Sequence, residues 1–276
     1  MCFCDASITI VFLSFSGIGQ TTYWQRAELK NEDRHSTLKR LDVQKARAFV
    51  LDERALKGEL SKVSRFKKLV RTIYFPDAEG KLIPFQVEEF QLFAPELAQK
   101  YPNIKSYRGV GTGPDKQKIF FSVSPKGIQT MIMDPGKEGT VFMEKAASGD
   151  YVVYNAKDHL THRLDFVCKT DPSRVALQST ASTAKLVEDQ SLRRFRLAIA
   201  ASGEYTQFHG GTVPDALAAI NATLTRVNGV FERDLGLTLE LIANTDTVIY
   251  TDPDTDPFSG SLSSQTQNTL TSVIGE

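Results

Sequence analysis

The sequence predicts an α+β protein, in which a mainly antiparallel β region precedes an incomplete α/β region. In residues 46–170, short apolar runs lie between Gly, Pro and Asp breakers and helical patterns are few. Residues 193–250 instead have the pattern strand, helix, strand, which implies a parallel pair with a right-handed crossover. Residues 171–190, rich in Ser, Thr and Ala, are predicted to be the linker between the two regions.

The amino-terminal residues predict export. Residues 8–16 form an apolar run, and small residues ending at Gly19 suit a signal-peptidase site, so residues 1–19 are predicted to be a signal peptide. The run is shorter than the about 20 residues that a membrane span needs. No Lys or Arg precedes it, so a buried N-terminal strand is the alternative. Residues 20–45 are polar and are expected to be a poorly ordered lead-in.

The β-rich region contains eight predicted strands and two short helices. Gly80 closes a predicted turn that needs a positive φ, and Pro84 suggests that its strand lies at an edge or begins there. The helices are predicted at residues 53–63 and 94–101. The strands are predicted at residues 48–52, 70–75, 82–90, 104–110, 118–123, 128–133, 140–143 and 151–154.

The α/β region begins with a run at residues 195–199 that is apolar enough for a strand buried on both faces. A long helix follows, with Thr212 as N-cap and Gly236 at its end. Residues 237–242 are the second strand, which residues 247–250 extend or rejoin, and a further helix begins at about residue 264. The apolar face of the long helix comprises Leu217, Ile220, Leu224, Val227, Val230 or Phe231, and Leu235.

The bulk composition is that of a globular protein with no preference for polyanions. Lys plus Arg and Asp plus Glu are both 33, so nothing favours nucleic acid as a partner. The three cysteines do not make a disulfide framework. Cys2 and Cys4 would leave with a signal peptide, so Cys168 is expected to be unpaired, as a buried inert residue, a reactive thiol or a metal ligand.

Few residues are arranged as a catalytic site. No phosphate loop, nucleophile elbow or cysteine pair at metal spacing is present, so no catalytic and no cofactor-binding residue is predicted. His159 and His162 have a spacing that would suit zinc, but their polar context favours solvated side chains. Tyr205 and His209 follow the first strand of the α/β region, where ligands bind in such sheets.

Two polar motifs have simpler interpretations. The series Asp252, Asp254 and Asp256 resembles a calcium loop only in composition, because it lacks the Gly and the distal Glu of an EF-hand, and a polar loop is preferred. Asn221 begins a glycosylation sequon, but this lies in the middle of the predicted helix.

Extended segments of both regions resemble a known family, the exported reprolysin-like zinc metallopeptidases of bacteria, and the resemblance covers most of residues 46–276. These proteins have the metzincin fold and are made as a leader, a propeptide domain and a catalytic domain. Residues 46–170 would then be propeptide-like and residues 191–276 the first part of the catalytic domain. The resemblance lies in residues 75–80, 85–89, 94–111, 151–154, 195–205, 218–235 and 249–251.

The resemblance implies a secreted zinc endopeptidase precursor that cleaves proteins or peptides. In the family, three histidines of His-Glu-x-x-His-x-x-Gly-x-x-His hold zinc and the Glu activates water. No segment here matches, so we expect a fragment that is truncated before the zinc helix, is inactive as given and does not bind zinc stably. Cys168 is the candidate fourth zinc ligand, as the cysteine switch of a propeptide.

The partners implied are peptide substrates of the full-length enzyme and an intramolecular contact between propeptide and catalytic domain, with no membrane span. The alternative is a non-enzymatic, exported β-rich binding or surface domain. In a third hypothesis, the first 190 residues act alone as an intramolecular chaperone and inhibitor of the enzyme. Residues 191–276 expressed alone are expected to aggregate, because their helix face and sheet edges would be uncovered.

Overall fold

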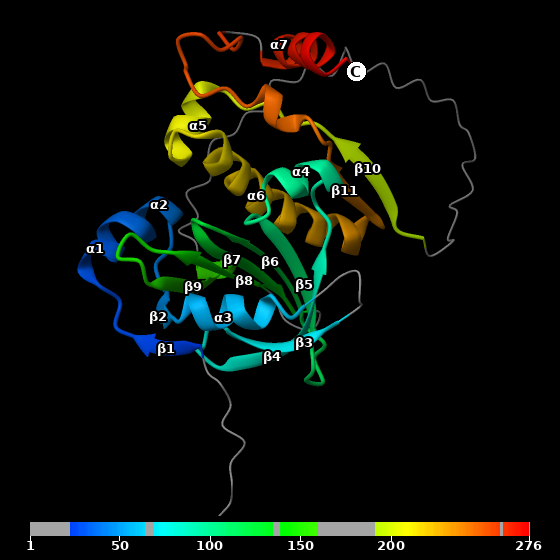
Figure 1. Ribbon diagram of the computed structural model, residues 1–276. Coiled ribbons are helices and arrows are strands. Elements are labelled where there is room, and N and C mark those ends of the chain that lie inside the picture. Colours follow the sequence, from blue (N-terminus) through cyan, green and yellow to red (C-terminus); the bar gives the residue numbers. More distant parts are fainter. Residues whose placement is uncertain (1–22, 64–68, 135–138, 159–190, 260–261, 276) are drawn as a thin grey trace, which may run out of the picture.

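The computed structural model describes residues 23–63, 69–134, 139–158, 191–259 and 262–275 (Figure 1). The predicted signal peptide, the linker, His159, His162 and Cys168 lie outside the described residues. None of the helices in the described ranges is both long and apolar enough to cross a bilayer.

A nine-stranded antiparallel sheet curls into a half-barrel (Figure 1). The strand order β1-β2-β9-β8-β7-β6-β5-β4-β3 pairs most strands with their neighbours in sequence, as hairpins do. The strands are β1 (Trp24–Ala27), β2 (Arg47–Leu51), β3 (Arg71–Pro76), β4 (Leu82–Phe90), β5 (Lys105–Gly111), β6 (Lys118–Ser124), β7 (Gly127–Met133), β8 (Thr140–Lys145) and β9 (Tyr151–Asn155).

The eight strands predicted in this region are all present, within a few residues of their expected ends. Gly80 has the positive φ expected of its turn, at 84°. Pro84 does not mark an edge strand, because β4 lies between β3 and β5. Proline has no N–H to donate, and Pro84 lies just outside the β4–β5 pairing, which ends at Gly111, so no hydrogen bond of that pairing is lost. The Pro84 carbonyl accepts from the Thr112 amide at 3.0 Å, and Pro84 therefore lies at the entry to the paired part of β4.

The interior of the half-barrel is a core that contains only residues preceding 154. Helix α3 (Glu53–Leu60) begins with Asp52 as N-cap, which accepts from the Ala55 amide at 2.9 Å, and it buries Leu56 and Leu60 against the sheet. The alternation of the strands explains the remainder of this core, because inward residues such as Ile73 and Phe85 are fully buried.

Residues 24–27 form a strand and residues 31–41 a helical segment, where the sequence led us to expect a poorly ordered lead-in. Trp24 is buried in the core and β1 pairs with β2. A continuous helical segment follows, comprising α1 (Asn31–Asp33), a π-helical turn (Arg34–Leu38) and α2 (Lys39–Leu41). Asp33 of this segment is buried and accepts from the Ser148 amide and hydroxyl, at 3.0 and 2.7 Å. Contacts with residues remote in sequence, which a local pattern does not report, therefore order the segment.

The second part contains the predicted strand, helix and strand. Strand β10 (Arg193–Leu197) pairs in parallel with β11 (Leu237–Leu241), and α6 (Val213–Asp234) connects them. Thr212 caps α6 and Gly236 ends it with a φ of 63°, as predicted. The additional helices are α4 (Pro95–Lys100) in the first part, α5 (Gly203–His209) and α7 (Leu262–Thr269), which continues as a π-helical turn (Leu270–Ile274).

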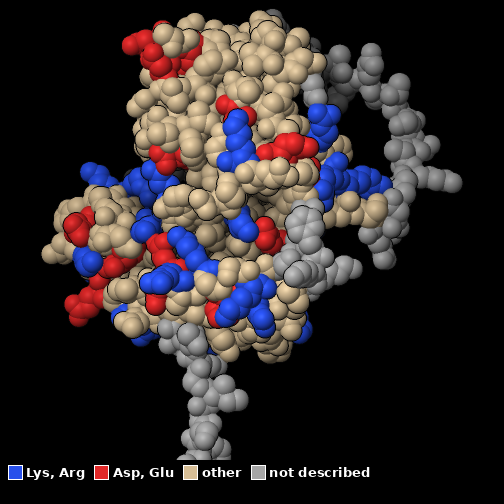
Figure 2. Space-filling view, viewed as in Figure 1, with Lys and Arg blue, Asp and Glu red and all other residues tan. Residues whose placement is uncertain are grey.

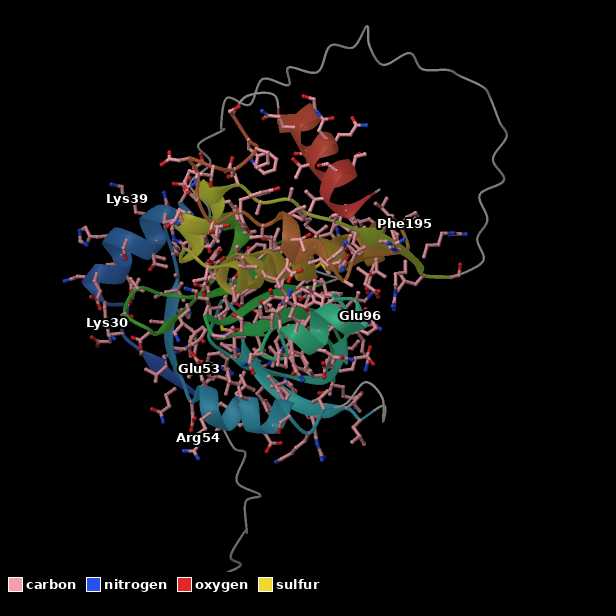
Figure 3. The ribbon with its side chains drawn as sticks, turned by 45° about the horizontal axis from the view of Figure 1, so that its top comes forward. Lys30, Lys39, Glu53, Arg54, Glu96 and Phe195 are labelled. Carbon is pink, nitrogen blue, oxygen red and sulfur yellow. The ribbon has the colours of Figure 1, made fainter. Side chains whose placement is uncertain are left out.

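Three details of this part differ from expectation. Strand β10 is not buried on both faces: Phe195 is 50% exposed, and Figure 3 shows it at the margin of the molecule. The described residues place only β11 beside β10, so little covers it. Residues Thr245–Val248 form a 3-10 turn rather than a strand. Ile249, directly after this turn, forms a parallel β-bridge with Ala201. Leu235, predicted to be on the apolar face of α6, is 60% exposed because it lies beyond the last turn.

Helix α6 lies between the half-barrel and the β10–β11 pair (Figure 1). Its residues Leu217, Ile220 and Leu224 share a second core with side chains of the sheet, including Phe120 and Met131. The approach is close at Gly229, where an added Cβ would lie 2.7 Å from the Met131 Cε and 2.8 Å from the Phe120 ring. The helix therefore buries two faces, of which the periodicity of its large apolar residues identifies one.

Candidate functional site

A groove of about 420 Å³ lies at the carboxyl end of β10, the position where open α/β sheets bind ligands. Ser202 caps α5 there by accepting from the Tyr205 amide at 3.4 Å, which turns the chain away from the sheet. The lining is mainly apolar and includes Ile199, Ala201, Tyr205, Ile220, Leu224 and Phe258. Such a surface can hold an apolar side chain. Its polar side chains are hydroxyls, such as those of Ser202 and Tyr205, and its lining contains no carboxylate, imidazole, thiol or amine.

Tyr205 and His209, the two residues predicted at this end of the sheet, contact each other on α5 with ring centroids 4.4 Å apart. Burial raises the pKa of Tyr205. Burial, together with the positive charges of Arg40 and Lys126, lowers the pKa of His209. The pair is thus neutral at pH 7 and joined by a ring contact, which is not the arrangement of a catalytic base and its orienting partner.

His209 also lines a second hollow, of about 350 Å³, between α5, α6 and the sheet. The charged groups of this hollow are paired, since Lys126 lies 3.1 Å from Asp215 and Arg40 lies 3.5 Å from Glu144. Figure 2 shows the same mixture of signs over the half-barrel, whereas the surface around α7 is nearly uncharged on the face shown. The hollow therefore does not present a field of one sign to a charged ligand.

The loop with three aspartates uses its carboxylates to hold the backbone. Asp256 Oδ2 accepts from the Gly203 amide at 2.6 Å, and Asp252 Oδ1 accepts from the Asp254 amide at 3.0 Å. The loop lies directly on Gly203, where a Cβ would be 2.2 Å from the Pro253 nitrogen. These contacts support the interpretation as a polar loop rather than a calcium loop.

The sequon asparagine is part of the protein interior. Asn221 is buried on α6; its Oδ1 accepts from the Ser106 hydroxyl at 2.9 Å and its Nδ2 donates to the Lys105 carbonyl at 3.3 Å. The Ser106 hydroxyl also lies 2.8 Å from Thr225 Oγ1. A glycan on Asn221 would have to separate α6 from β5, so the match to the sequon is fortuitous in the folded chain.

A polar cluster that the sequence analysis missed joins α4 to the turn after β11. The buried Asp246 carboxylate accepts from the Tyr101 hydroxyl at 2.8 Å and also from the Lys100 ammonium. Burial and this hydrogen bond raise the pKa of Tyr101 to about 12. Asp246 lies about 145 positions after Lys100 and Tyr101 in the chain, and no local motif could have indicated that they meet.

Charged side chains also join α6 to the half-barrel. Arg226 donates to Glu144 at 3.0 Å and to the carbonyls of Thr130 and Met143 at 3.3 and 3.4 Å. Arg108 of β5 donates to Glu232 at 3.0 Å. These groups hold two parts of the chain together, and they do not converge on a space where a substrate would react.

The described residues therefore define an α+β protein whose carboxyl-terminal part is a parallel strand–helix–strand unit, without a convergent catalytic set among them. Residues 192–276 match the model of a protein family described as Metallo-peptidase family M12B Reprolysin-like. For this segment the match confirms the predicted relationship to the reprolysin-like metallopeptidases of the metzincin group. A search of curated proteins finds no match.

The M12B family is zinc-dependent, and a zinc site needs several His, Cys, Asp or Glu side chains that converge on one point. They contain no group of three or more His, Cys, Asp or Glu side chains that could hold a metal ion. His209 has the Tyr205 and Phe208 rings beside it, and His35 contacts the Asn31 carbonyl at 2.7 Å on the surface. The described residues thus do not fit zinc, and no chemical step through the metal follows from them.

Proposed function

We propose that residues 192–276 are the amino-terminal part of a zinc endopeptidase domain, and that the chain is a fragment of a secreted peptidase precursor. The observation that carries this proposal is the family match over the residues that form β10, α6, β11 and α7. A fragment of this kind does not hydrolyse peptides itself; the substrates belong to the longer enzyme. The export signal at residues 1–19 is part of the proposal.

The β-rich region is the propeptide in this proposal. The second core supports it, because sheet residues such as Phe120 and Met131 pack with Leu217 and Leu224 of the peptidase-like segment. A propeptide needs such an interface in order to hold its peptidase domain before activation. Cys168 remains the candidate zinc ligand of the latent precursor, although it lies outside the described residues.

The coding sequence after Glu276 provides the first test. We expect a His-Glu-x-x-His-x-x-Gly-x-x-His segment within roughly the next hundred codons. The product of the extended sequence should bind zinc and hydrolyse an unfolded protein substrate after processing, and a chelator should abolish this activity. The 276-residue chain assayed in parallel should show neither property. An extended sequence without the motif would overturn the proposal.

A precursor variant tests the role of Cys168. In the extended product, Cys168→Ala should raise activity before processing, whereas Cys2→Ala, which lies within the proposed signal peptide, should leave latency unchanged. Equal latency of the Cys168→Ala variant and the wild type would remove the cysteine switch while leaving the peptidase assignment intact.

One observation favours the alternative of a non-enzymatic β-rich binding domain: the half-barrel has a core of its own, to which none of the described residues after 191 belongs. This alternative predicts that the extended sequence lacks the zinc motif.

A further inference from the structure

Residues Leu92–Ala94, between β4 and α4, extend the β10–β11 pair by a short third strand. The Leu241 amide donates to the Leu92 carbonyl at 2.7 Å, and the Ala94 amide donates to the Leu241 carbonyl at 2.8 Å. Phe93 and Leu241 accordingly form a parallel bridge. A segment of the half-barrel part thus supplies backbone hydrogen bonds to the sheet of the peptidase-like part.

On the same edge of β11, a side chain takes the place of a strand at Leu239, two residues before Leu241. Asn228 of α6 is fully buried; its Oδ1 accepts from the Leu239 amide at 2.8 Å and its Nδ2 donates to the Leu239 carbonyl at 2.9 Å. Leu239 and Leu241 therefore have both of their outward backbone groups satisfied, the first by α6 and the second by Leu92–Ala94. This part of the β11 edge is thus closed to a further strand, whereas β10 has no second partner strand among the described residues.

The contact around the short strand is apolar at its centre and polar at its rim. Leu92, Phe93 and Leu97 are buried in the second core together with Leu241. Asp246, with its partners Tyr101 and Lys100, closes the rim beside them. A desolvated apolar centre with hydrogen-bonded charges at the edge is the arrangement of a specific protein interface.

We propose that Leu92–Ala94 is a docking strand, by which residues 23–158 recognise residues 192–276 through strand addition to β11 and remain bound when the two parts are separate chains. The inference deepens the propeptide proposal and rests on it. The half-barrel holds the peptidase segment by the outer edge of β11 and by α6, so it leaves the β10 side for further strands of the longer domain.

The experiment separates the two parts in the full chain. A recognition sequence for a site-specific protease is inserted after residue 180, the purified chain is cut, and the fragments are analysed by size-exclusion chromatography at decreasing concentration. We expect the two fragments to elute together as a 1:1 complex. Separation of the wild-type fragments at micromolar concentration would overturn the proposal.

Ala94→Pro tests the strand itself. The φ of −54° and ψ of 151° at Ala94 suit proline, so this change removes the donated hydrogen bond without straining its own backbone. We expect the Kd of the cut fragments to rise at least tenfold, which corresponds to about 1.4 kcal/mol. Ala94→Ser is the matched control, since it keeps the N–H and suits the N-cap of α4. Equal retention of the two variants would show that the strand does not hold the fragments.

Hydrogen exchange in the uncut chain tests the same strand if the fragments of the cut Ala94→Pro variant are insoluble. In the Ala94→Pro chain the Leu241 amide should exchange at least tenfold faster than in the Ala94→Ser chain, because its local opening is easier. The Ile242 amide, which donates to the Leu197 carbonyl of β10 at 3.0 Å, should be unchanged. Unchanged exchange at Leu241 would also overturn the proposal. None of these readouts depends on zinc or activity, so their failure is distinct from the failure of the peptidase assignment.

Discussion

Trp24 Nε1 donates a hydrogen bond of 2.8 Å to the carbonyl of Tyr74, and this bond joins the two edge strands of the half-barrel. β1 and β3 are at opposite ends of the strand order, so no ladder connects them. Arg26 and Arg47 extend the connection by donating to the carbonyls of Glu79 and Ala78, at 3.1 and 2.9 Å. Side chains, rather than strand pairing, hold the curled sheet closed.

Trp24→Phe should destabilise the half-barrel by about 1–3 kcal/mol, because the Tyr74 carbonyl loses its donor while an aromatic ring is retained. Urea unfolding followed by far-UV circular dichroism measures the difference, since Trp24 is the chain's single tryptophan and its fluorescence is lost with it. Arg26→Ala removes the exposed hydrogen bond between Arg26 and the Glu79 carbonyl and should cost less than about 1 kcal/mol. A larger effect of Arg26→Ala than of Trp24→Phe would contradict this account.

Glu53 should make the stability of the half-barrel sensitive to acid. Burial alone would raise its pKa, but hydrogen bonds from Lys145, Lys57 and Tyr151 outweigh burial and lower the pKa from 4.5 to about 2. The folded pKa lies below the unfolded one, so ionised Glu53 stabilises the fold above about pH 4.5, and this contribution is lost as the pH falls toward 2.

We expect Glu53→Gln to cost about 1–2 kcal/mol at pH 7, a figure reduced for solvent screening. The difference from wild type should shrink between pH 4.5 and 2, as measured by urea unfolding at several pH values. Glu59→Gln, which removes the ion pair of this α3 residue with Lys62 in the turn after the helix, is the control and should cost less than about 1 kcal/mol. A constant difference for Glu53→Gln at every pH would count against the carboxylate as the cause.

Asn228→Ala should destabilise residues 192–276 strongly, because it leaves two backbone groups of the partly buried Leu239 without partners, at up to about 1–3 kcal/mol each. Asn228→Asp keeps the acceptor for the Leu239 amide but places an oxygen against the Leu239 carbonyl, so it should be at least as damaging at neutral pH. Hydrogen exchange at Leu239 checks both variants. Protection equal to wild type would show that water or another group replaces the amide.

Gly229→Ala should destabilise the chain although alanine favours helix. The added Cβ meets Phe120 and Met131 at less than 3 Å, and the cost of displacing them should exceed the about 1 kcal/mol gain in helix propensity. Gly58→Ala is the matched control in α3, because nothing lies within 4 Å of its Cβ, and it should stabilise by roughly 0.5–1 kcal/mol. Thermal unfolding should therefore move in opposite directions, and a gain for both variants would refute the close packing of α6.

Residues 192–276 expressed alone should aggregate or bind a hydrophobic dye, because Leu217, Leu224 and Leu241 would lose the sheet and the docking strand that cover them. The intact chain, with the same residues covered, is the control. Light scattering and dye fluorescence distinguish the two. A monodisperse segment with a cooperative thermal transition would show that it needs no cover from the half-barrel.

Local patterns predicted most elements of the fold because the patterns are produced by local causes. Alternation marks a strand with one buried face, and a breaker such as Gly80 marks its limit. The cap at Thr212 and the end at Gly236 follow from backbone groups within one turn. Patterns failed at β10, where the apolar run predicted burial on both faces while Phe195 is half exposed.

The contacts between the two parts could not be predicted in this way. Asn221 and Asn228 interrupt the apolar pattern of α6, and polar amides at such positions would be expected from sequence to face solvent. In the fold they are buried because Ser106 and the Leu239 backbone provide partners. For the candidate site, the sequence placed Tyr205 and His209 after the first strand of the α/β region, and only the structure shows that their rings contact each other.

The sequence by itself determined the order of the secondary structure, the parallel strand–helix–strand unit and the relationship of residues 192–276 to a peptidase family, since periodicity, caps and family motifs are properties of neighbouring residues. Tertiary structure decided how the half-barrel closes at Trp24, how α6 buries its second face, and which segment completes β11. These contacts join residues from about 50 to about 150 positions apart, and only packing in three dimensions brings such partners together.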